Sequence, residues 1–506
     1  MLAMISVADQ SLKSHIPRSK YFLAKSTSPK SLKLKGYGTG IYLNGSHQST
    51  GCGNYLLVIF LIGVDECFAC DVGSRSHWVA VGQSEQDVRE FGVFNQDLLA
   101  MADWLKEKSA KTIAIESTGT YWQNLYAILL SKGFHLILCN GKFTKNIKGK
   151  KTDVKDCQWI QKLHTLGLLT SSFLPDGSAE ELRTYCRQRA NLMHLAASTS
   201  KKMQKNLRLL YLRLDVVVND ICGLTGLLII RAICEGETDP NKLASLRHKN
   251  CRKSEEEIAK ALHSNGRRDY LFALQQELDT YDHIQKKIED CDKEIEKKLN
   301  EIIDSDSNKH EHYLESKPHK RVNKNTPKDI DMNLKAYQMF EGTDLLAIEG
   351  MSFSTVLALM SEVGMEGIKK FKTAKHFASW LRLAPNNKVS GGKVLSSKIP
   401  KGSNRLKIAL RNAANAIGNL KDSIPLRDFF QRISFRKGRV SAISATARKL
   451  AVIIWNMVVK GVPYINPEGY LYLDQKRKLG LVKRIKKQID KFGLTNEDLG
   501  LELSPN

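Results

Sequence analysis

Long apolar segments, patterned cysteines and excess acidic residues are what this sequence lacks. Its longest apolar run, Tyr55–Ile62, falls far short of the ~20 residues that span a bilayer, so no membrane-spanning segment or membrane role is expected. The 10 Cys have no regular spacing and accompany no secretory signal, which predicts reduced thiols in a cytoplasmic protein. Cys67 and Cys70 form a lone CxxC in a strand-like run, which favours a place in the core over a zinc site.

Positive charge is what the sequence has in excess. It contains 78 Lys and Arg against 53 Asp and Glu, a formal net charge of +25. This surplus points to a polyanionic partner, and nucleic acid is the first candidate. A length of 506 residues predicts two or three domains.

The composition changes along the chain and predicts an α/β domain, a helical region and a second, mostly helical domain. The α/β domain follows from strands expected at Cys67–Val72, His77–Gly82, Thr112–Ile115 and His135–Cys139, with helices between and after them. A further strand is expected at Tyr55–Val64. The predicted parts are a basic flexible leader (1–53), the α/β domain (54–178), the helical region (179–303), a polar linker (304–335), the second domain (336–465) and a basic tail (466–506).

An apolar seam marks the second half of the helical region. Apolar residues recur at steps of three and four from Leu271 to Ile302, with charged residues between them. The seam predicts a long antiparallel helical arm or a dimerising coiled coil. Packing on helices of the same chain is an equally good interpretation, because heptads do not identify the partner.

Acidic residues stand out in two segments of the α/β domain. Glu116 ends the strand-like run in Ile113-Ala-Ile-Glu-Ser-Thr-Gly-Thr-Tyr121. Asp153 and Asp156, three apart in Lys151-Thr-Asp-Val-Lys-Asp156, fall on one face of a helix's first turn. Upstream, Asp71 ends a strand before a turn, and Asp65 is the rival for that place.

These carboxylates fit the chemistry of phosphodiester cleavage. Hard oxygen ligands suit Mg²⁺ or Mn²⁺, and such ions stabilise the attacking and leaving oxygens of phosphoryl transfer. Each acid alone is as easily explained as a helix cap or a surface residue. The hypothesis therefore depends on the acids converging in the fold.

The acidic segments closely resemble those of the DEDD-type insertion-sequence transposases, relatives of the Piv and MooV DNA invertases. The resemblance, carried also by Asp71-Val-Gly-Ser-Arg-Ser-His-Trp-Val-Ala-Val81, runs from about Glu66 to Ile465. It implies an N-terminal domain similar to the RuvC resolvase, of ribonuclease H-like fold. It also implies that Asp71, Glu116, Asp153 and Asp156 are catalytic metal ligands.

The second domain resembles the family's C-terminal transposase domain through Leu383-Ala-Pro385, Ser390-Gly-Gly-Lys393 and Lys401-Gly-Ser-Asn-Arg405. The resemblance implies that Ser390 is a nucleophile that becomes joined to DNA, with Ser396 and Ser397 as fallbacks. Lys393, Lys401 and Arg405 would bind phosphate, although they also fit a cationic surface loop. Gly350 and Ser352 occupy the turn of a helical hairpin that contacts DNA in the family.

The function expected from the sequence is a DNA transposase and site-specific recombinase. The resemblance further implies a guide RNA. The acids and the serine lie far apart in the chain and must meet by folding back or between protomers, which implies a homo-oligomer, dimer or tetramer. Two alternatives stay open: a resolvase-like metal-dependent nuclease that needs no serine, and a non-catalytic nucleic-acid-binding protein.

Overall fold

The computed structural model describes residues 67–144, 152–175, 177–305, 326–402, 404–422, 424–464, 471–493 and 498, and the backbone of 22–26 and 55–59. The chain divides into two compact units, Met1–Phe173 and Leu174–Asn506. The first unit is mixed α/β and the second is largely helical.

A five-stranded mixed sheet organises the first unit, in the order β5-β4-β3-β6-β7. Its strands are β3 (Cys67–Val72), β4 (His77–Ala80), β5 (Val88–Phe91), β6 (Thr112–Glu116) and β7 (His135–Cys139). The pairs β3–β4 and β4–β5 are antiparallel, whereas β6 runs parallel to both β3 and β7. The strands expected within 67–139 are confirmed. The edge strand β5 was not expected, because exposed Arg89 and Glu90 leave it without an apolar run.

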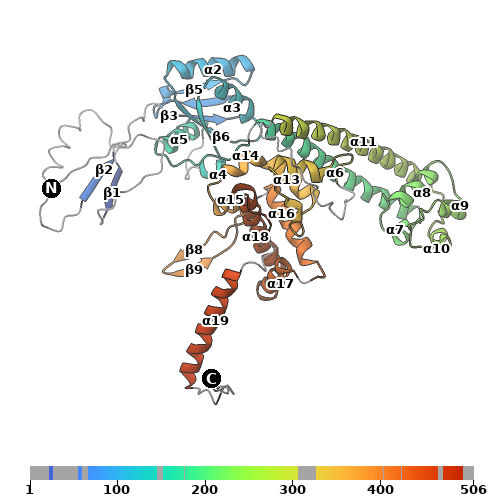
Figure 1. Cartoon of the computed structure of the whole chain (residues 1–506). Helices are drawn as coiled ribbons and strands as arrows, with labels where there is room; N and C mark the ends of the chain where they lie inside the picture. Colours follow the sequence, from blue (N-terminus) through green and yellow to red (C-terminus); the bar gives the residue numbers. More distant parts are fainter. Residues whose placement is uncertain are drawn as a thin grey trace. The chain divides into compact units, whose positions relative to one another are not determined.

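Three helices cover this sheet: α2 (Asn95–Glu107), α3 (Trp122–Ser131) and α5 (Asp153–Thr165). Figure 1 shows α2 and α5 on opposite sides of the strands. The short helix α4 (Gly141–Thr144) follows β7. Helix α5 begins three residues earlier than its periodic run at Asp156 indicates, because Thr152 caps it by accepting a hydrogen bond from Lys155 N.

Another strand pair precedes this sheet. Strand β1 (Phe22–Ser26), within the predicted flexible leader, pairs antiparallel with β2 (Tyr55–Ile59). The strand expected at Tyr55–Val64 is therefore only partly observed, and it belongs to a separate two-stranded sheet. The rest of it, 60–64, lies outside the described residues.

Two long helices run side by side in the second unit, α6 (Gly177–Leu209) and α11 (Arg268–Ser305) (Figure 1). Ion pairs join Glu181 to Lys298 at 2.5 Å and Lys202 to Glu277 at 3.2 Å, so the helices are antiparallel. Seam residues such as Leu274, Ile295 and Leu299 are fully buried. The predicted seam is thus buried within one chain as a helical pair.

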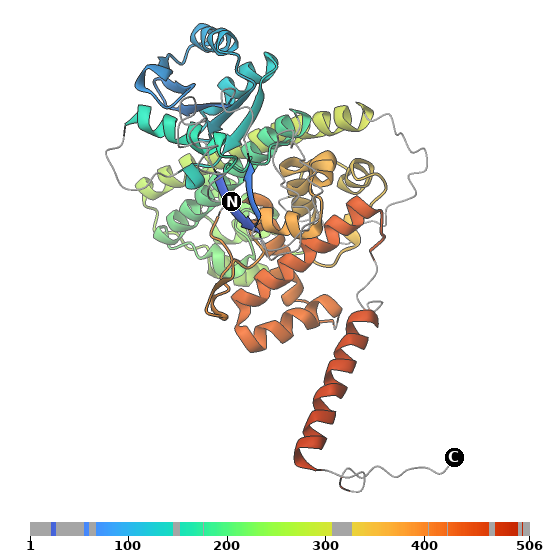
Figure 2. The ribbon, with the colours of Figure 1, turned by 90° about the vertical axis from the view of Figure 1, so that its left-hand side faces the viewer.

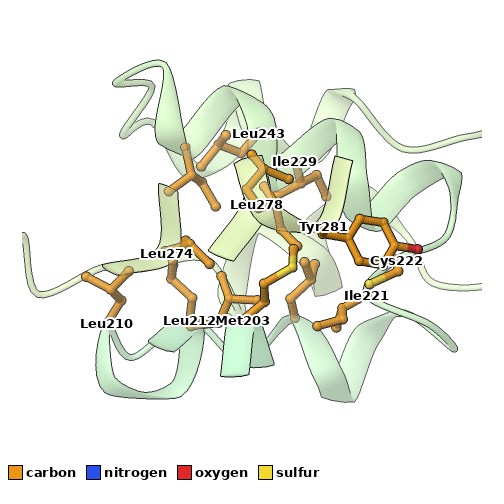
Figure 3. Packing of buried hydrophobic residues seen from close by; sticks show 14 of the residues in the cluster. Met203, Leu210, Leu212, Ile221, Cys222, Ile229, Leu243, Leu274, Leu278 and Tyr281 are labelled. Atoms are coloured by element: carbon orange, nitrogen blue, oxygen red, sulfur yellow. The ribbon is translucent and has the colours of Figure 1, made fainter. Parts of the chain in front are cut away.

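Four short helices cap the end of this pair at which α6 ends and α11 begins: α7 (Leu214–Val217), α8 (Leu224–Cys234), α9 (Pro240–Ser245) and α10 (Glu255–Lys260). Figure 3 shows their core, in which Met203 of α6 and Leu274, Leu278 and Tyr281 of α11 meet Ile229 of α8. Burial of these apolar side chains holds the cap together.

The segment predicted as a linker is structured where it is described. Residues 306–325 lie outside the described part, but Lys328 N donates a hydrogen bond to Asp292 Oδ2 at 3.1 Å. Helix α12 (Met332–Met339) then begins with Asp331 as its N-cap. The prediction of a linker up to residue 335 is therefore wrong at its end, because a polar composition also suits a capped helix start.

The remaining helices form one group, in which α14–α17 pack on α18 (Arg439–Lys460) and α13 packs on α16; Figure 2 shows this group in shades of orange. They are α13 (Phe353–Glu362), α14 (Gly364–Lys369), α15 (Ala374–Trp380), α16 (Arg405–Gly418) and α17 (Pro425–Lys437); α19 (Leu471–Phe492) follows α18 in the sequence. Among the described helices α18 is long and apolar enough to cross a membrane. It is nevertheless a core helix, since it packs on α14–α17 and buries Leu450 and Ile454 completely.

Candidate active site

The carboxyl ends of β3 and β6 place two of the predicted acids side by side. The strands are parallel with Cys70 opposite Ile115, so the next positions along them are Asp71 and Glu116. Side chains alternate along a strand, so Asp71 shares a face with Ala69, and Glu116 with Ala114. Both alanines are fully buried in a cluster with Ile160 of α5. The two acids therefore lie on the face that α5 covers.

Hydrogen bonds fix the direction of α5 across this face. Near its start, Cys157 Sγ donates to Trp78 O at 2.9 Å, and further on Gln161 Nε2 donates to Cys67 O at 3.0 Å. Near its end, His164 Nε2 lies 2.9 Å from Thr112 Oγ1. Since Cys67 and Thr112 begin their strands, the first turn of α5 lies at the carboxyl ends.

The first turn of α5 carries the other two acids to this edge. Asp153 is its first residue and is exposed, and Asp156, one turn later, is half-buried. Asp71 and Glu116 are half-buried as well. All four predicted acids thus approach the same edge of the sheet, which the spacing in the sequence alone does not establish.

The pKa values of two buried thiols, Cys139 and Cys157, are raised partly by the neighbouring acids. Burial, with the Glu116 and Asp71 carboxylates adding to it, raises the pKa of the Cys139 thiol to about 12. Burial also raises the pKa of the Cys157 thiol far above its ordinary value, and Asp71 and Asp156 contribute. Asp71 acts on both thiols, Glu116 on the first and Asp156 on the second.

The segments that follow β6 and β7 hold the Glu116 carboxylate. Thr144 Oγ1 of α4 donates to Glu116 Oε2, and Thr118 Oγ1 donates to Oε1 at 3.4 Å. Gly141 lies against the same group, because a Cβ at this position would come within 2.5 Å of Oε1. Sequence reasoning missed Gly141 and Thr144, since neither belongs to the acidic segments.

The four carboxylates at this edge offer only oxygen ligands, which are the ligands that a hard divalent cation prefers. In the described part of the chain, however, no three His, Cys, Asp or Glu side chains come close enough to hold an ion. The acids therefore share an edge without forming a closed ligand set. Asp65, the rival to Asp71, lies outside the described residues.

Ser390 lies at the tip of an exposed hairpin in the second unit. Strands β8 (Lys388–Ser390) and β9 (Lys393–Ser396) are joined by Gly391 and Gly392, whose φ values are +54° and +74°. Positive φ at both positions suits a tight two-residue turn, which explains the glycine pair. Within the described part of the chain the Ser390 hydroxyl has no hydrogen-bond partner. Of the fallbacks, Ser396 accepts a hydrogen bond from Lys398 N and Ser397 is exposed.

The predicted basic residues follow the hairpin from tip to base. Lys393 pairs with Ser390 across the strands, Lys401 follows β9, and Arg405 begins α16; all three are exposed. Arg382 reaches the base by donating from Nη1 to Lys401 O at 2.5 Å. Sequence reasoning missed Arg382 because it lies outside the matching motifs.

The turn at Gly350 and Ser352 is explained by packing and capping. A Cβ at Gly350 would meet Ala413 O at 2.7 Å, so the glycine allows this turn to touch α16. Ser352 caps α13 by accepting a hydrogen bond from Thr355 N at 3.3 Å. The predicted first helix of this hairpin is a single 3₁₀ turn, Leu345–Ala347.

Comparison with protein families gives two matches in the chain. A transposase model of the DEDD, IS110 type matches residues 68–212, which include all four acids of the sheet edge. A model described as the transposase IS116/IS110/IS902 family matches residues 343–429, which include Ser390 and the basic residues of the hairpin. No curated protein gives a significant match.

Proposed function

Because the chain belongs to the DEDD-type insertion-sequence transposases, which are DNA transposases and recombinases, we propose that it cuts and exchanges DNA strands with Ser390 as nucleophile. The approach of Asp71, Glu116, Asp153 and Asp156 to one edge of a mixed sheet carries the proposal. This arrangement also favours a ribonuclease H-like fold for the unit that contains them.

In the proposed reaction the serine attacks the DNA and the acids would bind the metal ion. The Ser390 oxygen attacks the phosphorus, a phosphoserine bond forms, and the bond to the leaving deoxyribose oxygen breaks, while the serine proton is lost and the leaving oxygen gains one. The carboxylates would hold Mg²⁺ or Mn²⁺, which when bound offsets the charge of the phosphate and the leaving oxygen. Thr144 and Thr118 orient the Glu116 carboxylate for that task.

The position of Ser390 supports its role as an attacking group. It is exposed at the tip of a hairpin, where a DNA strand can reach the hydroxyl without rearrangement of the core. Lys393, opposite it in the ladder, supplies positive charge beside the attacked phosphate. Reversal of the same step, with a different deoxyribose oxygen attacking the phosphoserine, joins the new strand.

The proposal extends to the partners. DNA is the substrate, a guide RNA selects it, and a homo-oligomer works in the cytoplasm. The net charge of +25 supports nucleic-acid partners without separating RNA from DNA. RNA that co-purifies with the protein and matches the DNA flanking its gene would support guidance, whereas nucleic acid of random sequence would count against it.

A trapping experiment tests the serine. Full-length protein is incubated with DNA of the element's ends and Mg²⁺, denatured, and assayed for a covalent protein–DNA adduct by gel shift and mass spectrometry. We expect an adduct at Ser390, its loss in Ser390→Ala, and its retention in the matched variant Ser397→Ala. Strand cleavage by Ser390→Ala without any wild-type adduct would instead indicate a resolvase-like nuclease.

A second arm tests the acids. Asp156→Asn keeps the size of the side chain and removes its charge, so we expect strand cleavage to be lost while DNA binding is kept. Asp290→Asn, an exposed acid on α11, is the matched control and should cleave normally. Normal cleavage by Asp156→Asn contradicts its role, and loss of both binding and cleavage contradicts the assignment to chemistry.

A further inference from the structure

A group of cations lies at the base of the β8–β9 hairpin, at the opposite end of the hairpin from Ser390. Lys407 and Arg411 are one turn apart on α16, and Arg382 follows α15. Residues four apart on a helix are neighbours, and like charges at that spacing repel. In the described part of the chain none of these cations forms a salt bridge with a carboxylate.

Lys407 is the unusual member, because it is a buried ammonium without a counter-ion. Its exposed fraction is 6%, and its Nζ donates to Pro400 O at 3.2 Å. An ammonium has three N–H donors, and this carbonyl accepts one of them. Burial lowers the pKa of Lys407, and the charges of Arg411 and Arg382 lower it further.

Its neighbours are held in place by neutral acceptors. Arg382 donates to Lys401 O, and Arg411 Nη1 donates to Ser444 Oγ of α18 at 2.7 Å. These bonds fix the guanidinium groups and leave other N–H donors available. The cluster is therefore rigid and positively charged, and the free-energy cost of burying a cation among cations is not offset within the described chain.

A bound anion would offset this cost, and the position of the cluster identifies its kind. The first turn of α16 carries the partial positive charge of a helix start. The hairpin leads from the cluster to Ser390 at its tip. A DNA strand laid along the hairpin would bring one backbone phosphate to the tip and another to the base.

We propose that Arg382, Lys407 and Arg411 bind a backbone phosphate of the DNA strand that Ser390 attacks, and so fix the register of that strand. The proposal rests on the proposed function for the identity of the strand. The site itself is a binding site, since none of its residues takes part in the bond exchange.

The test measures the binding of a fluorescent DNA duplex by the full chain carrying Ser390→Ala, over a series of KCl concentrations. Loss of one phosphate contact lowers the slope of log K against log salt by about 0.9. We expect that decrease for Lys407→Met, which keeps the apolar stem, and recovery in Lys407→Arg. Lys297→Met, an exposed lysine of α11, is the matched control and should keep the slope.

Arg411→Gln is the second variant and is expected to lower the slope equally; it decides the outcome if circular dichroism shows that Lys407→Met does not fold. A slope equal to that of Lys297→Met in the folded variants overturns the proposal. Melting temperatures in potassium phosphate and in KCl of equal ionic strength separate the sources of phosphate. Stabilisation by free phosphate without any change in the DNA slope overturns the DNA assignment.

Because binding is measured without chemistry, this result is independent of the serine adduct. A missing adduct with a normal decrease in slope would remove Ser390 from the mechanism and keep the phosphate site. An adduct with an unchanged slope would keep Ser390 in the mechanism and remove the phosphate site.

Discussion

Gly141→Ala tests whether the position of the Glu116 carboxylate controls the reaction. The added Cβ would lie 2.5 Å from Glu116 Oε1, whereas carbon and oxygen atoms in contact are separated by about 3.4 Å, so the carboxylate must move by about 1 Å. This movement disturbs the hydrogen bonds from Thr144 and Thr118. The charge of the site is unchanged, so any effect comes from geometry.

The expected loss follows from the displacement. A misplacement of about 1 Å in a catalytic group lowers a rate by roughly 10²-fold, which corresponds to about 2.7 kcal/mol in the barrier. The free energy of unfolding should change by less than about 0.5 kcal/mol, because the clash is with the flexible end of a side chain. Activity and stability should therefore separate in this variant.

The assay is single-turnover cleavage of element-end DNA with Mg²⁺ in excess, with thermal unfolding measured on the same samples. Gly177→Ala is the matched control, because a Cβ there meets nothing within 4 Å. It should cleave at the wild-type rate. Cleavage at that rate by Gly141→Ala as well would refute the role given to the Glu116 carboxylate.

Two further predictions concern stability. Asp292→Leu breaks the buried ion pair with Arg189 and should lower the free energy of unfolding by about 3–5 kcal/mol, measured by urea titration followed by circular dichroism. The double variant Asp292→Leu, Arg189→Met should recover most of this loss. An equal loss of stability in the single and the double variant would contradict the cost of a buried unpaired arginine. Burial lowers the pKa of His164, so the unfolded state, with its pKa of about 6.5, binds more protons. Stability should therefore fall as the pH drops from about 7 through 6.5 toward the lowered pKa. His164→Gln should have a flatter melting temperature profile over this pH range, and an unchanged profile would contradict the assignment.

Local patterns predicted most elements of the α/β unit. Buried strands such as β6 and β7 are apolar runs ended by turn residues, and the helix after Thr152 has a capping residue before its periodic positions. The strand β5 escaped prediction because an edge strand exposes most of its side chains. The end of the predicted linker escaped because its contacts, such as that of Lys328 with Asp292, join residues far apart in the chain.

Some residues of the candidate site could likewise be predicted from the sequence, and others could not. The identities and local positions of Glu116, Asp153 and Asp156 can be read from short motifs, and so can the glycine turn beside Ser390. Gly141, Thr144 and Lys407 could not be found, because each matters through a neighbour from another element. No local pattern marks a glycine that faces a carboxylate or a lysine that is buried among arginines.

The sequence by itself determined most elements of the α/β unit, the basic charge and the resemblance to the transposase family, because these depend on side chains close together in the chain. Only the tertiary structure decided that the first turn of α5 lies at the carboxyl ends of β3 and β6, since the bonds of Cys157, Gln161 and His164 to distant strands set that direction. It also decided that the apolar seam of α11 is buried against α6 of the same chain. Heptad spacing specifies an apolar face, and folding selects the surface that covers it.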